Sequence, residues 1–245
     1  MTVILTSSPT GPLDKSRIVD GLDTKNGFIE TLRKRWKADA KCLLIAASPA
    51  ESQCSDGMRD HLRGALEQSG LTVSAFDVWD DRTQDFSQAV LCTYDVVVLG
   101  GGHVPTQNAF FQRIELREKL QVFSGMVIGI SAGSMNSADV VYAQPELPGE
   151  SVDPNYRRFI PGLGLTKVNI LPHYQMIRDT ELDGKRVFED ITYPDSVGRE
   201  FIALPDGGYL LSEQGSETIF GEAYRIADGK IEQICREDEQ LVLLV

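Results

Sequence analysis

Short apolar runs alternate with amphipathic stretches through the first two thirds of the chain. The run at 126–130, Met-Val-Ile-Gly-Ile, is apolar at every position and predicts a strand that is buried on both faces. Similar runs lie at 2–6, 41–47, 71–76, 95–100 and 167–171, and helical patterns lie at 51–68, 84–91 and 108–122. Buried strands separated by single helices predict a mostly parallel sheet with helices on both faces.

The last third of the chain has a different pattern. Short strand patterns follow one another there, and glycine turns at 206–208 and 228–229 separate some of them. The expected strands are 201–204, 209–212, 218–220, 222–226, 230–235 and 240–245. We therefore expect one α/β domain over residues 1–245. Its predicted architecture is a three-layer α/β/α sandwich, with a mostly parallel central sheet and antiparallel C-terminal strands at its edge.

Charge and composition narrow the possible functions. The chain has 24 Lys and Arg against 36 Asp and Glu, a net charge of −12, and such a field repels nucleic acid and anionic lipid. No apolar run approaches the about 20 residues that span a bilayer, and the start lacks the basic region of a secretory signal. The four cysteines form no Cys-x-x-Cys pair. We expect a cytoplasmic protein with no cofactor, metal, nucleic-acid or membrane partner.

The segment Gly129-Ile-Ser131-Ala-Gly133 matches the Gly-x-Ser-x-Gly pattern directly after the most apolar strand. A serine that is lifted out of a sheet on a sharp strand-to-helix turn needs small neighbours, because the turn must close tightly. The helix that follows would offer free N–H groups near the serine oxygen. The pattern predicts that Ser131 is a nucleophile; an ordinary tight turn is the alternative.

A nucleophilic serine needs a base, and the chain has three histidines. His61 lies within the predicted helix 51–68, whereas His103 and His173 each follow a predicted strand, where open α/β sheets place their ligands. Only His173 lies after Ser131, as the Ser-acid-His order of α/β-hydrolase sheets requires. We expect His173 to be the base, with His103 as the alternative. No His-x-x-x-His spacing supports a metal site.

The triple glycine 100–102 lies at the end of another predicted strand. It does not complete a dinucleotide-binding fingerprint, because Pro105 replaces the third glycine of that pattern. Glycines let the backbone approach a reacting carbonyl, so the N–H groups of Gly102 and Ala132 could together hold an oxyanion. A flexible strand-to-helix turn is the alternative interpretation.

Four segments occur in the order seen in a known family: Gly-Gly-Gly at 100–102, Gly-Ile-Ser-Ala-Gly-Ser at 129–134, Pro-His-Tyr at 172–174 and Leu-Pro-Asp-Gly at 204–207. Over roughly residues 40–212 the chain resembles the dipeptidase E and cyanophycinase family of serine peptidases, which has a class I glutamine-amidotransferase-like fold. The resemblance implies peptide-bond hydrolysis with Ser131 as nucleophile, His173 as base and Gly102 and Ala132 as oxyanion donors.

The resemblance also implies an acid between the serine and the histidine. The position that matches by count from the serine is Glu146, in the proline-rich irregular segment 143–160. A neighbouring proline on each side of the Glu146-Leu147 pair would hold the carboxylate in place at low entropy cost. Asp153 is the alternative acid.

The segments after the glycines and after His173 depart from the family pattern, so the family's substrate preference is not carried over. An arginine in the pocket would suit a carboxylate-bearing substrate, and we expect His103, Arg157 and Arg178 to bind substrate, with Arg158 as a further candidate.

We expect a serine peptidase that acts on dipeptides or small acidic peptides through a Ser-His-Glu triad, with a small peptide as its partner and a homodimer as one possible assembly. The alternatives are a cyanophycinase-like or isoaspartyl peptide hydrolase, and a non-hydrolytic protein that binds a small acidic metabolite. Amidotransferase chemistry is disfavoured because it normally uses a cysteine as the nucleophile, at the position where this chain has Ser131.

Overall fold

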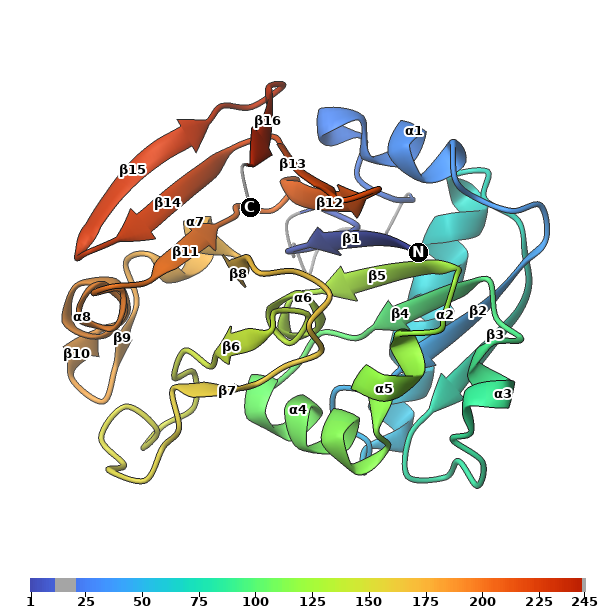
Figure 1. Cartoon of the computed structure of the whole chain (residues 1–245), viewed down its shortest axis with the longest axis horizontal. Helices are drawn as coiled ribbons and strands as arrows, with labels where there is room; N and C mark the ends of the chain where they lie inside the picture. Colours follow the sequence, from blue (N-terminus) through green and yellow to red (C-terminus); the bar gives the residue numbers. More distant parts are fainter. Residues whose placement is uncertain (12–20, 244–245) are drawn as a thin grey trace.

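A computed structural model describes residues 1–11 and 21–243. Its central sheet has eight strands in the order β16-β13-β12-β1-β5-β4-β2-β3 (Figure 1). These strands are β1 (Thr2–Thr6), β2 (Ala40–Ile45), β3 (Val73–Trp79), β4 (Val96–Leu99), β5 (Met126–Ile130), β12 (Tyr209–Glu213), β13 (Ser216–Phe220) and β16 (Gln240–Leu243). The strands from β1 to β3 in this order are parallel, and β12, β13 and β16 extend the sheet in antiparallel fashion. The expected mostly parallel sheet is confirmed.

Helices cover both faces of this sheet. The helices are α1 (Phe28–Arg33) and α2 (Ser52–Gln68) on one face, and α3 (Gln88–Leu91), α4 (Val104–Arg113) and α5 (Leu116–Leu120) on the other. The alternation of side chains along β1 shows the two layers: Ile4 packs with α1 and α2, whereas Leu5 packs in the cluster that contains Phe110 of α4. The three-layer arrangement follows from strands that are apolar on both faces.

A second sheet lies beside the first and was not expected. Its strands, in the order β15-β14-β11-β8, are β15 (Lys230–Cys235), β14 (Ala223–Ala227), β11 (Glu200–Ala203) and β8 (Asn169–Leu171). The expectation that every C-terminal strand joins the edge of the parallel sheet is therefore wrong for β11, β14 and β15. These strands pair with β8 instead, and Phe201 of β11 stacks on Tyr142 in a separate apolar cluster. That cluster gives the second sheet a core of its own.

Short elements complete the described chain. They are the 3₁₀ turn Lys25–Gly27, α6 (Ala132–Met135), β6 (Val140–Tyr142), β7 (Phe159–Pro161), α7 (Tyr174–Ile177), β9 (Glu181–Leu182), β10 (Lys185–Arg186), the π-helical turn Val187–Thr192 and α8 (Tyr193–Asp195). The helix expected at 108–122 begins earlier, at Val104, and is interrupted at Glu115, where φ is 52°. Pro105 is tolerated because it lies in the first helical turn.

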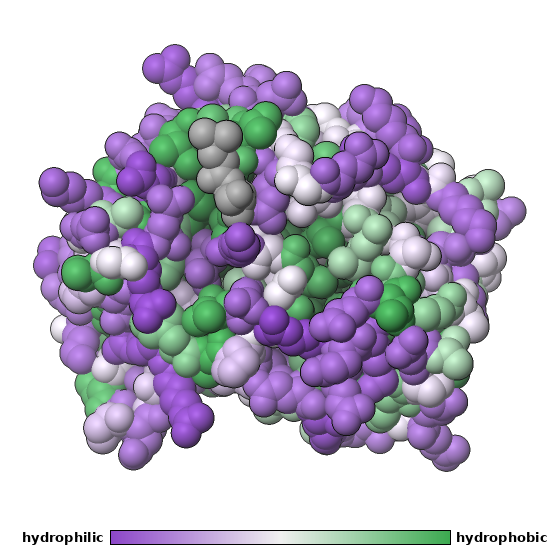
Figure 2. Space-filling view, viewed as in Figure 1, coloured by the Kyte–Doolittle hydropathy of each residue, from purple (hydrophilic) through white to green (hydrophobic). Residues whose placement is uncertain are grey.

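Hydrophilic residues cover most of the face shown in Figure 2, and apolar residues are visible near its centre. Within the described residues, no helix has both the length and the apolar character that a membrane span needs. The final residues of the strand expected at 240–245, Leu244 and Val245, lie outside the described residues.

Candidate active site

Ser131 lies at the turn between β5 and α6, where its backbone has φ 50° and ψ −111°. A residue other than glycine keeps such a conformation only where the surrounding structure enforces it. The Ser131 N–H donates to the Thr6 carbonyl at the end of β1, at 3.0 Å, which fixes the turn to the neighbouring strand. The strained strand-to-helix turn is the geometry that Gly-x-Ser-x-Gly predicts.

Close packing requires the two glycines that flank Ser131. A Cβ atom at Gly129 would lie 2.8 Å from Leu5 Cδ2, and one at Gly133 would collide with the Leu99 carbonyl. Side chains at either position would push the turn away from β1 or β4. The small residues of the pattern therefore have a steric cause.

His173 and Asp206 follow two strands that pair in parallel. Leu171 of β8 lies opposite Ala203 of β11. Pro172 and His173 follow β8 directly, whereas Leu204 separates β11 from Pro205 and Asp206. Because parallel strands end at the same edge of a sheet, the two side chains meet. His173 Nδ1 lies 2.7 Å from Asp206 Oδ1.

The surroundings of Asp206 assign the histidine tautomer. The Asp206 side chain is 1% exposed, and its Oδ2 accepts a hydrogen bond from Gln175 Nε2 at 2.7 Å. A carboxylate accepts hydrogen bonds, so the neutral imidazole that donates its Nδ1 proton to Asp206 has Nε2 as its acceptor. That tautomer of the imidazole is the one that can take a proton from a hydroxyl group.

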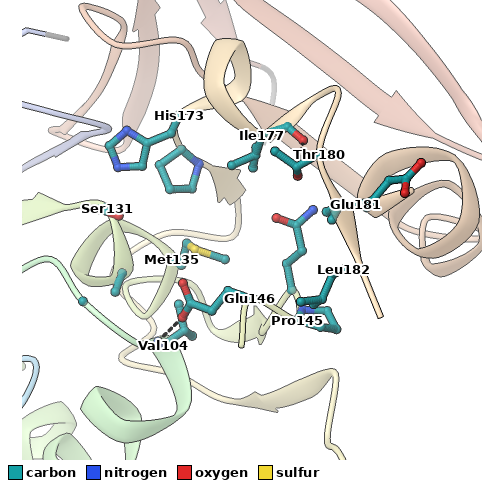
Figure 3. A pocket seen from close by; sticks show the side chains of 15 residues that line it. Val104, Ser131, Met135, Pro145, Glu146, His173, Ile177, Thr180, Glu181 and Leu182 are labelled. Carbon is teal, nitrogen blue, oxygen red and sulfur yellow. Dashed lines mark hydrogen bonds between the residues drawn. The ribbon is translucent and has the colours of Figure 1, made fainter. Parts of the chain in front are cut away.

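A cavity of about 310 Å³ borders both Ser131 and His173 (Figure 3). Figure 3 shows His173 and Ser131 on one side, Val104 and Glu146 below them, and Thr180, Glu181 and Leu182 on the far side. The complete lining consists of Gly102, Val104, Ser131, Ala132, Met135, Gln144, Pro145, Glu146, Pro172, His173, Ile177, Thr180, Glu181, Leu182 and Val187. A second cavity of about 260 Å³ shares Gly102, Ser131 and His173 with it. The serine therefore faces space on two sides.

Gly102 and Ala132 both line the larger cavity with Ser131. Ala132 is the first residue of α6, so its N–H has no acceptor within the helix. At Gly102 a Cβ atom would lie 2.7 Å from Ala47 Cβ, which leaves room only for glycine. The structure brings both expected oxyanion donors to the wall that holds the serine.

Glu146, the expected third member of the triad, is bound elsewhere. One of its carboxylate oxygens accepts the Val104 N–H at 3.1 Å, the dashed contact in Figure 3. Burial raises the pKa of this carboxyl, and the Val104 donor opposes that effect. The carboxylate that contacts His173 is that of Asp206, and the structure shows no contact between His173 and Glu146 among its described hydrogen bonds. The alternative acid, Asp153, is exposed and accepts the Asn155 N–H within its own turn.

The residues expected to bind substrate do not line either cavity in the described part of the chain. His103 Nε2 lies 2.7 Å from Glu150 Oε1, and Nδ1 lies 2.7 Å from Thr106 Oγ1, so both ring nitrogens are engaged. Arg157 is exposed, and Arg178 is an exposed partner of Asp179. Solvent exposure and, for Arg178, a local ion pair explain why these arginines lie at the surface.

Asp206 was missed as an acid, although the sequence carries a signal for it. Leu171-Pro-His and Leu204-Pro-Asp are matching tripeptides, and each begins at the last residue of a predicted strand. Two such strand ends lie side by side when the strands pair in parallel, and β11 was expected among the antiparallel C-terminal strands.

Comparisons with known proteins show the family and the fold of the chain. The model of peptidase family S51 matches residues 23–220. A peptidase from an acI-B1 Actinobacterium has a similar solved structure, with a TM-score of 0.62 and 15% identity over 99% of this chain and 96% of that one. A candidate peptidase E from Listeria monocytogenes EGD-e gives a TM-score of 0.54 and 16% identity over 95% and 97% of the two chains. A search of curated protein sequences found no match.

Proposed function

Because the chain belongs to peptidase family S51, we propose that it is a serine peptidase with a Ser131-His173-Asp206 triad. The observation that carries the proposal is the pairing of His173 Nδ1 with the buried Asp206 carboxylate, at 2.7 Å, beside a strained serine and a cavity. Asp206 would hold the imidazole tautomer and stabilise the imidazolium that forms when the serine loses its proton.

In the proposed reaction, Ser131 Oγ attacks the carbonyl carbon of the substrate while His173 Nε2 takes the hydroxyl proton. The N–H groups of Gly102 and Ala132 would stabilise the oxyanion. His173 then returns the proton to the leaving amine, and the C–N bond breaks to leave an acyl group on Ser131. Water releases this group by the same steps in reverse order, with His173 again as the base.

The two cavities that share Ser131 support a substrate with groups on both sides of the scissile bond, so we propose dipeptides and other small peptides. The lining of the larger cavity includes Glu146 and Glu181 but no lysine or arginine among its described residues. A substrate residue with a carboxylate would meet no lysine or arginine among these lining residues. We therefore propose that the larger cavity accepts neutral or basic substrate residues in preference to acidic ones.

Hydrolysis of a dipeptide panel tests the proposal. Dipeptides with alanine, lysine, aspartate or isoaspartate at the amino terminus would be incubated with the wild-type protein and with Ser131→Ala. Loss of a triad nucleophile costs on the order of 10⁶-fold in kcat, so we expect Ser131→Ala to be inactive. Ser134→Ala is the matched control, because its hydroxyl donates away from the cavity to the Thr6 carbonyl at 2.8 Å.

Wild-type turnover by a folded Ser131→Ala variant would refute the serine mechanism. A strict requirement for aspartate or isoaspartate would refute the proposed preference and restore the acidic peptides expected from the sequence. Binding of peptides without any hydrolysis would favour the non-hydrolytic alternative.

A further inference from the structure

Two glutamates of the segment 143–153 bind the turn that follows Gly102. His103 Nε2 lies 2.7 Å from Glu150 Oε1, and the Val104 N–H donates to Glu146 Oε1 at 3.1 Å. His103 and Val104 directly follow the glycine whose N–H is the proposed oxyanion donor. The segment is therefore attached to the two residues next to that donor.

Glu150 connects this attachment to the rest of the segment. Its second oxygen, Oε2, accepts the N–H groups of Glu146 and Leu147, each at 2.9 Å. The side chains of Glu150 and His103 are only 15% and 21% exposed, and the second ring nitrogen of His103 lies 2.7 Å from Thr106 Oγ1. One carboxylate thus joins the His103 ring to the backbone that carries Glu146.

An oxyanion donor must be held in place before the charge develops, because a donor that has to move contributes less. Gly102 lies in a run of three glycines, and glycine has more backbone freedom than any other residue. On one side it is confined by Ala47. On the other side, Glu150 contacts His103 and Glu146 contacts Val104 from the segment 143–153. Asn136 Nδ2 also donates to the Val104 carbonyl at 3.1 Å, and Gln107 Nε2 donates to the Gly100 carbonyl at 2.7 Å.

We infer that Glu150, acting through His103, is a positioning residue that fixes the Gly102 N–H for catalysis. Glu146 makes a second contact of the same kind at Val104. The inference rests on the proposed serine mechanism and gives His103 and Glu146 a role that differs from the ones expected from sequence. His103 supports the oxyanion site and does not bind substrate.

Steady-state kinetics of Glu150→Ala and His103→Ala test the inference. Removing one oxyanion donor costs about 10²–10³-fold in kcat, and a displaced donor should cost less, about 10-fold. We expect kcat to fall by that factor in each variant while KM changes by less than about twofold, because the contact matters in the transition state. The double variant should lose little more than either single variant, since both remove the same contact.

Two further variants separate positioning from a general effect on the segment. Glu150→Gln keeps an oxygen acceptor and can donate its amide to His103 Nε2, so we expect it to restore most of kcat. Asp183→Ala is the matched control, because Asp183 accepts the Gly149 and Ser151 N–H groups at 2.9 and 3.2 Å and so holds the same segment away from Gly102. We expect its kcat to stay near the wild-type value.

Thermal unfolding of each variant would confirm that it is folded before the kinetics are compared. An unchanged kcat in folded Glu150→Ala, a raised KM at constant kcat, or an equal loss in Asp183→Ala would overturn the inference. Ser131→Ala, measured in the same series, tests the proposed function separately: activity in that variant refutes the serine mechanism, whatever Glu150→Ala shows.

Discussion

At the scale of residues, the end of β1 organises the candidate site. Ser131 and His173 both have positive φ angles, 50° and 57°, and conformations of this kind cost about 1–3 kcal/mol each when strained. The Thr6 carbonyl accepts the Ser131 N–H, and the Ser7 hydroxyl accepts the His173 N–H at 3.2 Å. Ser7 also donates to the carbonyl of Leu204, two residues before Asp206, at 2.8 Å. Thr6, the last residue of β1, and Ser7, the next residue, thus bond to Ser131, to His173 and to the strand end that leads to Asp206.

Replacement of Asp206 by asparagine tests the proposed acid. The amide cannot hold the imidazole in the required tautomer, so kcat of Asp206→Asn should fall on the order of 10⁴-fold. Glu146→Gln is the matched comparison, because Glu146 borders the same cavity but binds Val104. We expect it to lose no more than about 10-fold, in line with a displaced oxyanion donor. The opposite ranking of the two variants would return the role of acid to Glu146.

At the scale of elements, the sequence predicts the bounds of a strand well where the apolar pattern is strong. β1, β5 and β15 have the predicted bounds, because each is an unbroken strand pattern between clear turns. Pairing between strands could not be predicted equally well. β11 and β14 carry the same short pattern as β12 and β13, and the choice between the two sheets depends on contacts such as Phe201 with Tyr142, which are distant in sequence.

The same limit explains which site residues were found. Ser131, Gly102 and Ala132 belong to local strand-to-helix turns, so their positions follow from sequence. His173 was chosen by an order of Ser, acid and His, whereas the acid observed beside it comes later in the chain. The long-range attachment of the segment 143–153 to His103 has no local signature.

Two glycine-to-alanine variants test the packing of these elements. Gly133→Ala would place a methyl group against the Leu99 carbonyl, and overpacking of this kind costs about 1–3 kcal/mol of unfolding free energy. Gly57→Ala is the control: it lies in α2 with nothing within 4 Å of the added atom, and helix propensity should stabilise it by about 0.5–1 kcal/mol. Denaturant unfolding would measure both. Equal stability of the two variants would contradict the close packing described for the turn at Ser131.

At the scale of the whole molecule, the two sheets place the candidate site between them. The central sheet supplies Ser131 through β5 and Gly102 after β4, and the second sheet supplies His173 after β8 and Asp206 after β11. Ser7, at the end of β1, bonds to both strand ends of the second sheet. The proposed activity therefore depends on how the two sheets pack, and not on one strand-to-helix turn alone.

The most direct test of the triad is covalent labelling by a serine-directed phosphonate, with the adduct located by peptide mass spectrometry. The account predicts one adduct, on Ser131, that is absent from Ser131→Ala and forms far more slowly in His173→Ala and Asp206→Asn. A wild-type protein that hydrolyses peptides without forming this adduct, or an adduct on another residue that abolishes hydrolysis, would contradict the account.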